Sequence, residues 1–384
     1  MAPFSGLKIT SFVPLFVGLF LAYHVVIQVQ GVRDIASRLT EEENLEVERQ
    51  LQMLNKPPIK TIHTRWGVIY DCIEFHKQPA FDNPLLKKHA IPKKVETAPR
   101  SPKETLMSRI EGCPKGTVPI RRTTKEDLLR AKYLSSTSNA PGDEYRAGST
   151  LQTSDQKIFG ATGVVNVWHP KVNPDQFSGA EISVTAGPAD QTNEIRFGWT
   201  VNPQLYGDDR PSTYSYWTGD GGHNTGCYNT LCSGFVQVDQ HYTPAMAVAN
   251  TSTIGGTQYI LISSIIRERE TGHWWLMLEN KIQVGYWPRE LFPQFESGAD
   301  YIYWGGHVKS GKDGMPEMAS GNRPDRFNNH TGYFEQLEYK DKDDRWVPYP
   351  KIQSIVDCKG SYDSFWDDEH AILHFGGPGG GTCD

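Results

Sequence analysis

From about residue 160 onward, the sequence is divided into short segments rich in Val, Ile, Thr, Tyr and Trp, separated by clusters of Gly, Pro, Asn and Asp. Segments of this length and composition are typical of β-strands, and the clusters between them are typical of turns. Because no helical periodicity intervenes, the sequence predicts a mainly β fold, an antiparallel β-sandwich or barrel. The segments are Gly163–Trp168, Ala180–Thr185, Ile195–Val201, Gly234–Val238, Gln258–Ile266, Trp274–Leu278 and Tyr301–Val308.

The residues before this region have a different pattern, in which helices are expected as well as strands. Thr40–Leu54 is an acidic helix candidate, in which Thr40 and Glu43 form a capping-box pattern. Lys60–Glu74 predicts one or two strands, and Thr124–Lys132 predicts a second helix capped by its first residue. Residues 133–150 have neither an apolar period nor bulk, which is typical of an exposed linker. We therefore expect a leader at residues 1–31, a small α+β front segment at 32–132, a linker at 133–150 and a β-sandwich at 151–384.

The first 31 residues resemble a secretory leader. Lys8 precedes a mostly apolar stretch from Phe12 to Val29, and Val29-Gln30-Gly31 offers small residues at suitable positions for signal-peptidase cleavage. The competing interpretation is a single-pass signal anchor at residues 12–29, because about 18 apolar residues just span a bilayer. Membrane association is expected only if this segment is not cleaved.

Cysteine usage and glycosylation motifs also indicate export. The six cysteines are even in number, and proximity in sequence suggests three local bridges among fifteen formal connectivities. The sequons at Asn250 and Asn329 can be used only in the secretory route. The expected location is therefore extracellular or vacuolar. The cysteines are Cys72, Cys113, Cys227, Cys232, Cys358 and Cys383.

Charge is unevenly distributed along the chain. Residues 32–130 contain 19 Lys and Arg against 14 Asp and Glu, whereas residues 131–384 contain 19 against 31. A basic front segment and an acidic main domain would attract each other, although two unrelated solvated surfaces explain the counts equally well. An acidic main domain gives no support for nucleic-acid binding.

Two short motifs carry a family resemblance. Ile195–Trp199 reads I-R-F-G-W and Trp304–His307 reads W-G-G-H. They resemble the I-E-A-G-W and W-G-G-E segments of the neprosin family of plant glutamic endopeptidases, but the glutamate is replaced in both. Further runs in the same order support the resemblance. They include Gln78–Leu86, Cys113–Arg122, Leu205–Asp208, Gly226–Asn229, Gly285–Pro288 and Phe375–Gly379.

The resemblance implies a secreted zymogen, with residues 32–132 as the activation peptide and a β-sandwich domain that cleaves after proline. It also implies a mechanism with two facing glutamates, one ionised to activate water and one protonated to stabilise the oxyanion. Arg196 and His307 occupy those two positions in this sequence. Arginine cannot act as a base, and His307 beside it has no acidic partner. We therefore expect the two-glutamate chemistry to be absent.

Few of the remaining side chains are candidates for replacement catalytic groups. Glu194 lies on the same strand face as Arg196 and is a candidate partner for His307, although it is equally suited to neutralising Arg196. Four other carboxylates follow turn-like or exposed sequence and are interpreted as surface groups: Glu181, Glu290, Glu296 and Glu317. No metal or cofactor is expected, because the candidate histidines lack a zinc-binding spacing. Those histidines are His223, His241, His273 and His307.

Several aromatic residues are candidates for a ligand groove, with the sandwich core as the alternative. They are Trp199, Tyr216, Trp217 and Trp304. The resulting hypothesis is a secreted neprosin-like binding or decoy module that takes a peptide or protein ligand, including proline-rich ones, and contacts its own prosegment. A fixed Arg196 charge beside the His307 imidazole would suit a ligand carboxylate. The alternatives are an active prolyl endopeptidase that uses Glu194 with His307, and a cell-wall or carbohydrate-binding protein.

Overall fold

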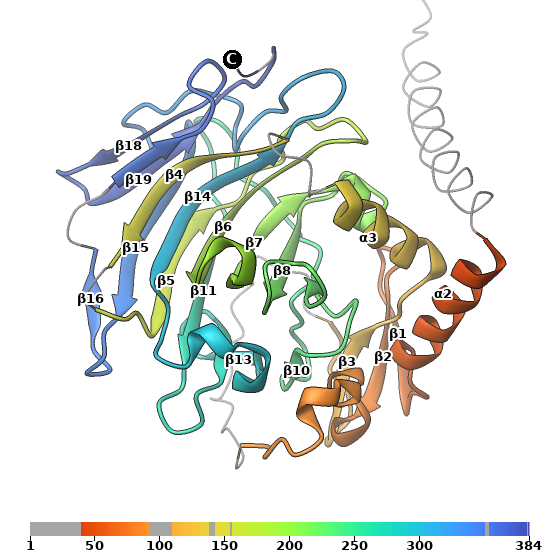
Figure 1. Cartoon of the computed structure of the whole chain (residues 1–384). Helices are drawn as coiled ribbons and strands as arrows, with labels where there is room; N and C mark the ends of the chain where they lie inside the picture. The colour runs from red at the N-terminus through yellow and green to blue at the C-terminus, as the bar shows by residue number, and fades with distance from the viewer. Residues whose placement is uncertain are drawn as a thin grey trace, which may run out of the picture.

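The computed structural model describes residues 40–92, 110–137, 143–153, 156–349, 353–381 and 383. These residues form a mainly β molecule in which two large antiparallel sheets pack face to face, and a small α+β front segment lies against one side (Figure 1). The expected leader at residues 1–31 lies outside the described residues. Within the described ranges, no helix has the length and apolar character needed to cross a membrane.

The front segment contains the two expected helices and a three-stranded sheet. Helix α2 (Glu41–Leu54) begins after Thr40, whose side chain and Glu43 form the expected capping box. Helix α3 (Lys125–Thr137) packs its buried leucines against those of α2. The sheet has the order β1-β2-β3. Its strands are β1 (Lys60–His63), β2 (Ile69–Glu74) and β3 (Thr117–Arg121).

The first large sheet has seven strands, and all the pairings within it are antiparallel. In spatial order they are β17 (Gln353–Val356), β4 (Glu144–Gln152), β14 (Tyr301–Lys309), β6 (Phe177–Ala186), β7 (Asn193–Val201), β8 (Ser212–Thr218) and β9 (Cys227–Tyr228). The two motif-bearing strands, β7 and β14, are therefore not direct neighbours and do not face each other, because β6 pairs with both.

The second large sheet has nine strands and is also antiparallel. In order they are β10 (Val236–Gln237), β13 (Ile282–Trp287), β12 (Trp274–Leu278), β11 (Ile260–Arg267), β5 (Gly160–Asn166), β15 (Gly332–Lys340), β19 (Ile372–Gly376) and β18 (Asp363–Asp367), with β16 (Trp346–Pro348) paired to β15. Short helical turns connect the strands: α4 (Pro203–Tyr206) and the 3-10 turns Phe75–Lys77, Pro79–Asp82, Pro84–Leu86, Ala189–Gln191, Arg289–Leu291 and Pro293–Phe295.

The core between the two sheets contains most of the large aromatic side chains. Trp199 and Trp304 are completely buried, and their indole N–H groups donate across the sandwich to the carbonyls of Asn166 and Thr162 on β5. Trp217 is also buried in this core. The prediction that these three tryptophans line a groove is therefore wrong, because strand alternation directs them inward. Trp199 and Trp304 bridge the sheets instead.

The predicted linker is much shorter than expected. Residues up to Thr137 belong to α3, and residues from Glu144 onward belong to β4, so only 138–143 lie between the two elements. Strand β4 pairs with β14 along its whole length. The polar composition of this stretch suggested a linker, but its alternate residues Ala147, Ser149 and Leu151 face the sandwich core.

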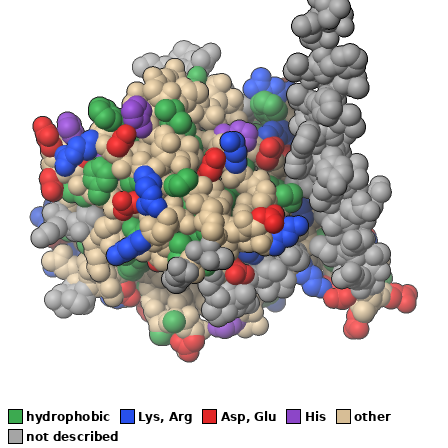
Figure 2. Space-filling model, turned by 90° about the horizontal axis from the view of Figure 1, so that it is seen from above, with side chains coloured by type: hydrophobic (Ala, Val, Ile, Leu, Met, Phe, Trp, Pro, Cys, Tyr) green, Lys and Arg blue, Asp and Glu red, His purple; other side chains and the backbone are tan. Residues whose placement is uncertain are grey.

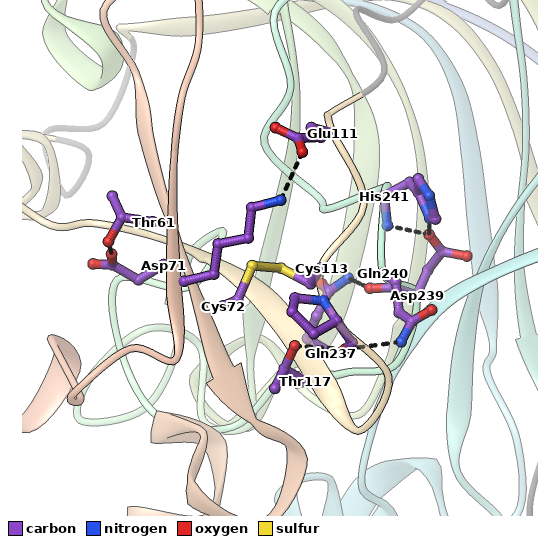
Figure 3. Close-up of a disulfide and its surroundings, with 12 residues drawn as sticks. Thr61, Asp71, Cys72, Glu111, Cys113, Thr117, Gln237, Asp239, Gln240 and His241 are labelled. Atoms are coloured by element: carbon purple, nitrogen blue, oxygen red, sulfur yellow. Dashed lines mark hydrogen bonds and ion pairs between the residues drawn. A yellow bond between two sulfur atoms is a disulfide. The ribbon is translucent and has the colours of Figure 1, made fainter.

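Three disulfides join the six cysteines in the pairs that sequence proximity suggested: Cys72–Cys113, Cys227–Cys232 and Cys358–Cys383. The first bridge ties β2 to the chain before β3 (Figure 3). Both sequon asparagines lie outside strands, with Asn250 exposed and Asn329 partly exposed.

Within the residues that the structure describes, the contacts between the front segment and the main domain are mainly uncharged. The side chain of Gln78 accepts from the backbone N–H of Gln237 at 2.7 Å and donates to its carbonyl at 3.1 Å, so it occupies the free edge of β10. Beside the first disulfide, the Cys113 backbone donates to the Gln240 carbonyl at 3.0 Å. Among the described residues, His89 and Glu290 are the one pair of basic and acidic side chains from the two parts whose nitrogen and oxygen lie within 4.0 Å of each other. Acidic and basic side chains are also interspersed, rather than segregated, on the face shown in Figure 2.

Candidate functional site

Strand alternation places both motif residues on the outer face of the seven-stranded sheet. On β7, Ile195 and Phe197 point into the core, so Glu194 and Arg196 point to the opposite face. The same alternation on β14 directs His307 to that outer face. The expectation that Glu194 and Arg196 share one face is confirmed by a hydrogen bond of 2.8 Å between their side chains.

Glu181 stands between the two motif strands. It lies on β6, opposite Gly198 of β7 and Gly305 of β14. A Cβ atom at Gly305 would lie 2.5 Å from the Tyr303 hydroxyl oxygen, so the Tyr303 side chain lies directly over this glycine. A Cβ atom at Gly198 would lie 1.9 Å from the Ala180 carbonyl oxygen, so the backbone itself requires glycine there. The glycines of both motifs therefore shape the surroundings of Glu181.

His307 lies between two carboxylates. Its Nε2 is 2.9 Å from Glu144 Oε2 on β4, and its Nδ1 is 3.4 Å from Glu181 Oε2 on β6. Tyr214 donates its hydroxyl hydrogen to the same Glu181 oxygen. We call the connected group of ionisable side chains on this face the alternating-charge cluster; in order of contact it comprises Glu144, His307, Glu181, Arg146, Glu194 and Arg196.

Two arginines complete the cluster. Arg146 Nη2 lies 3.6 Å from Glu181 Oε1 and 3.8 Å from Glu194 Oε1, so it connects β6 with β7. Arg196 contacts Glu194 and also lies over the ring of Tyr216, 5.1 Å from its centroid. Each acid in the cluster therefore contacts a base, and each base contacts an acid.

Burial makes these contacts electrostatically strong. Burial by itself would disfavour the charged forms, but His307 outweighs it and lowers the pKa of Glu144 to about 2. Burial likewise raises the pKa of Glu181, but His307 and the two arginines outweigh it. They place the pKa of this fully buried carboxyl well below its usual range. For His307, burial is outweighed by Glu181 and Glu144, which raise its pKa. An imidazolium between two carboxylates is the favoured state in acid.

Two buried polar atoms of the cluster have no hydrogen-bond partner among the described residues. They are Glu181 Oε1, an acceptor, and Arg196 Nε, a donor. Both atoms have almost no solvent-accessible surface, so a ligand reaches them only if the side chains around them move.

The structure revises several predictions about this site. Glu181, interpreted as a surface group, is completely buried at its centre. Glu194 contacts Arg196 and Arg146, whereas the carboxylates within 4.0 Å of His307 among the described residues are Glu144 and Glu181. The proposed couple of Glu194 with His307 is therefore replaced by different pairs. Of the predicted groove residues, Tyr216 lies on the outer face.

The sequence contains a pattern that indicates part of the alternating-charge cluster, although its residues were not predicted. In the predicted strand Ala180–Thr185, apolar residues alternate with Glu181, Ser183 and Thr185, which is the pattern that placed Arg196 on an outer face. Glu144 and Arg146 were missed because their strand was interpreted as a linker. The alternation of β4 becomes readable only once it is known to be a strand.

The arrangement limits the chemistry available on this face. A two-glutamate hydrolysis requires one protonated carboxyl beside an ionised one. Glu144 and Glu181, which flank His307, both have lowered pKa values and remain ionised in mild acid. Arg196 cannot deprotonate, because Glu194 and Glu181 outweigh its burial and raise its pKa further. The side chains described on this face therefore supply no carboxyl that stays protonated at mildly acidic pH and lies next to His307.

The fold and the site define a two-sheet antiparallel β-sandwich, preceded by a disulfide-bridged α+β segment, with buried ionisable side chains on one outer sheet face. The chain belongs to the neprosin family: the Neprosin profile matches residues 174–378, and the neprosin activation peptide matches residues 61–159. The activation-peptide match extends through β4, so the cluster draws residues from both matched regions.

Among solved structures, the chain is similar to Scytalido-glutamic peptidase bound to a peptide-based transition-state analogue. That match has 13% sequence identity and a TM-score of 0.34, and covers 61% of this chain and 98% of that chain. A second similar structure is SCP-B, a member of the eqolisin family of peptidases, in complex with the tripeptide Ala-Ile-His. It has 11% identity and a TM-score of 0.32, with the same coverage.

Proposed function

We infer that this protein is a secreted neprosin-family binding module that lacks two-glutamate peptidase activity. The observation that carries this inference is the position of His307, which stands where the family motif has glutamate and is held between Glu144 and Glu181 at 2.9 and 3.4 Å. Arg196, at the other motif position, is held by Glu194 at 2.8 Å. The side chains of His307 and Arg196 are thus both engaged in ion pairs.

The geometry favours an uncharged ligand over the carboxylate expected from sequence. Three carboxylates neutralise the two arginines and the His307 imidazolium, so little positive charge is left for an acidic ligand. The ligand we propose is a peptide segment, proline-rich segments included, that binds across β6 and β7.

The three disulfides, the two accessible sequons and the family support an exported protein, whether extracellular or vacuolar. The activation-peptide match supports a prosegment, which we propose extends from residue 32 to the start of β4. A peptide ligand is compatible both with an extracellular or vacuolar location and with the presence of a prosegment.

The decisive test is a cleavage assay with Pro-containing peptides, run before and after acid treatment of the full-length protein and read by mass spectrometry. The expected result is intact peptide at every pH. Loss of both members of an acid–base pair removes about 10²–10⁴-fold for each group acting alone. Cleavage that persists in Arg196→Ala and His307→Ala but disappears in Glu194→Gln would contradict the inference and establish a relocated site.

A second candidate function, carbohydrate binding, rests on a different surface. A pocket of about 570 Å³ on the nine-stranded sheet is lined by Trp346, Trp366 and Tyr349 together with Glu335. Aromatic faces beside polar groups are a usual composition for ligand sites. Binding to an immobilised oligosaccharide series, lost in Trp346→Ala and kept in His307→Ala, would favour this function over peptide binding.

A further inference from the structure

A second group of ionisable side chains lies away from the alternating-charge cluster, where the front segment meets the main domain. His89 follows the turn Pro84–Leu86, His273 immediately precedes β12, and Glu290 lies in the turn Arg289–Leu291 after β13. One nitrogen or oxygen atom from each of the three lies within 4.8 Å of the other two. Because the three residues are far apart in sequence, no sequence motif indicates that they lie together.

His89 lies in this group, and its Nδ1 has no hydrogen-bond partner among the described residues. Its side chain is 1% exposed, and its Nε2 lies 3.0 Å from the hydroxyl of Tyr286. Its Nδ1 lies 3.5 Å from Glu290 Oε2, and neither atom has a hydrogen-bond partner among the described residues. A buried imidazole nitrogen facing a buried carboxylate oxygen is unfavourable unless a cation or a proton lies between them.

The spacing suits a metal ion. Zinc bound tetrahedrally at 2.0–2.1 Å places its ligand atoms about 3.3–3.4 Å apart. The distance of 3.5 Å between His89 Nδ1 and Glu290 Oε2 is close to that value. The third ligand atom, from His273, is within 4.8 Å and needs to approach by about 1 Å. Two imidazoles and one carboxylate form a ligand set that zinc prefers.

The surroundings orient the ligands. If His89 donates its Nε2 hydrogen to the Tyr286 hydroxyl, the Nδ1 lone pair is free to bind a metal, which is how neighbouring groups usually fix a ligating imidazole.

Two features limit the affinity. His273 Nδ1 accepts the backbone N–H of Arg289 at 3.1 Å, so a metal would bind His273 through Nε2, or through Nδ1 only after this hydrogen bond is lost. The guanidinium groups of Arg267 and Arg289 also lie near enough to act on His273 electrostatically, and they repel a dication. Binding is therefore expected in the micromolar range rather than at the tighter values of four-ligand structural sites.

We propose that His89, His273 and Glu290 bind one zinc ion that ties the front segment to the main domain. One ligand comes from the region that matches the activation peptide, and two come from the neprosin domain. The metal would thus hold the front segment in place after the chain between the two parts has been cut. This role is independent of the peptide ligand proposed for the outer face.

The test is equilibrium dialysis of the full-length, chelator-treated protein against zinc chloride at pH 7.5, with bound metal measured by elemental mass spectrometry. We expect one zinc per chain and saturation at micromolar concentration. Glu290→Gln preserves the side-chain shape and should weaken binding at least tenfold, as should His89→Gln. The matched control is His76→Gln, which removes an exposed histidine of the same segment and should change nothing.

A second measurement guards against misfolding of a variant. Zinc should raise the melting temperature of the wild-type protein and of His76→Gln, but not of Glu290→Gln. Absence of saturable zinc binding below about 100 μM would overturn the proposal. Equal zinc binding by wild type and Glu290→Gln would overturn it as well, even if His89→Gln failed to fold.

Discussion

Glu144 and His307 are 163 residues apart in the chain, and their side chains meet at 2.9 Å across β4 and β14. Through this contact, β4, the first strand of the sandwich, contributes a side chain to the alternating-charge cluster. Arg146, two residues further along β4, lies directly opposite His307 in the strand register. The stretch that follows the front segment therefore supplies one acid and one base to the face that bears the family motifs.

The pH dependence of stability follows from the two shifted groups. The pKa of Glu144 is lowered from 4.5 to about 2, so its pairing stabilises the fold above pH 4.5 and is lost as the pH falls through 2. The pKa of His307 is raised above 6.5, so its pairing is present below pH 6.5 and is lost as the pH rises through the raised value. Thermal unfolding should show greatest stability between pH 4.5 and 6.5.

The variant His307→Gln tests the alkaline side of that profile. At pH 5 it should lower stability by about 1–3 kcal/mol, because Glu144 and Glu181 lose a charged partner. The difference from wild type should shrink at higher pH, where the wild-type imidazole is neutral. A constant difference from pH 5 to pH 9 would contradict the assigned ion pairs. His76→Gln, at an exposed position, is the control.

Glu194→Gln tests whether Arg196 depends on its carboxylate. The guanidinium lies mostly out of solvent, with 15% of its side chain exposed, so loss of the charge at 194 should cost about 1–3 kcal/mol of unfolding free energy. Glu46→Gln removes the partner of the exposed Arg49 and should have a much smaller effect. Urea unfolding of both variants gives the comparison, and equal midpoints would refute the role of the Glu194 contact.

Replacing both motif residues by glutamate should not restore a working site by itself. Arg196→Glu with His307→Glu would leave five carboxylates facing Arg146, and their mutual repulsion should raise their pKa values and lower stability. Adding Glu181→Gln removes the most buried of these charges and should recover part of the stability at pH 5. Melting temperatures and peptide cleavage, measured side by side, test this. A double variant as stable as wild type would argue against the cluster.

The front segment should stay docked in high salt. Its described contacts are mainly hydrogen bonds and aromatic packing, so 0.5 M NaCl should weaken its association less than Gln78→Ala does. Gel filtration after cleavage of residues 138–143 measures the retained fraction. Release by salt alone would show that the opposite net charges of the two parts, rather than these contacts, hold them together.

Loss of the Cys72–Cys113 bridge should destabilise the front segment. The bridge closes a sequence separation of 41 residues, for which the chain-entropy model gives about 4 kcal/mol. A Cys72→Ser, Cys113→Ser double variant should therefore expose the front segment to limited proteolysis while the sandwich remains resistant. The corresponding serine pair at Cys227 and Cys232, with a separation of 5 residues, should have a smaller effect.

The sequence by itself determined some of the strands and the start of helix α2. Short β-branched and aromatic segments predicted β6, β7, β12 and β14 within a few residues, and the capping box at Thr40 and Glu43 predicted the start of α2. These features are local, since they depend on side-chain alternation and on backbone groups a few residues apart. The motif residues and the family were readable for the same reason.

The tertiary structure alone decided which charges meet. His307 contacts Glu144 and Glu181 because β14 is paired between β4 and β6, and strand order is not encoded in the local pattern of any one strand. The same holds for His89, His273 and Glu290, which converge where the front segment docks. In the alternating-charge cluster, burial strengthens the ion pairs that shift the pKa values of Glu144, Glu181 and His307, because the strength of a charge pair depends on the solvent that the surrounding fold excludes.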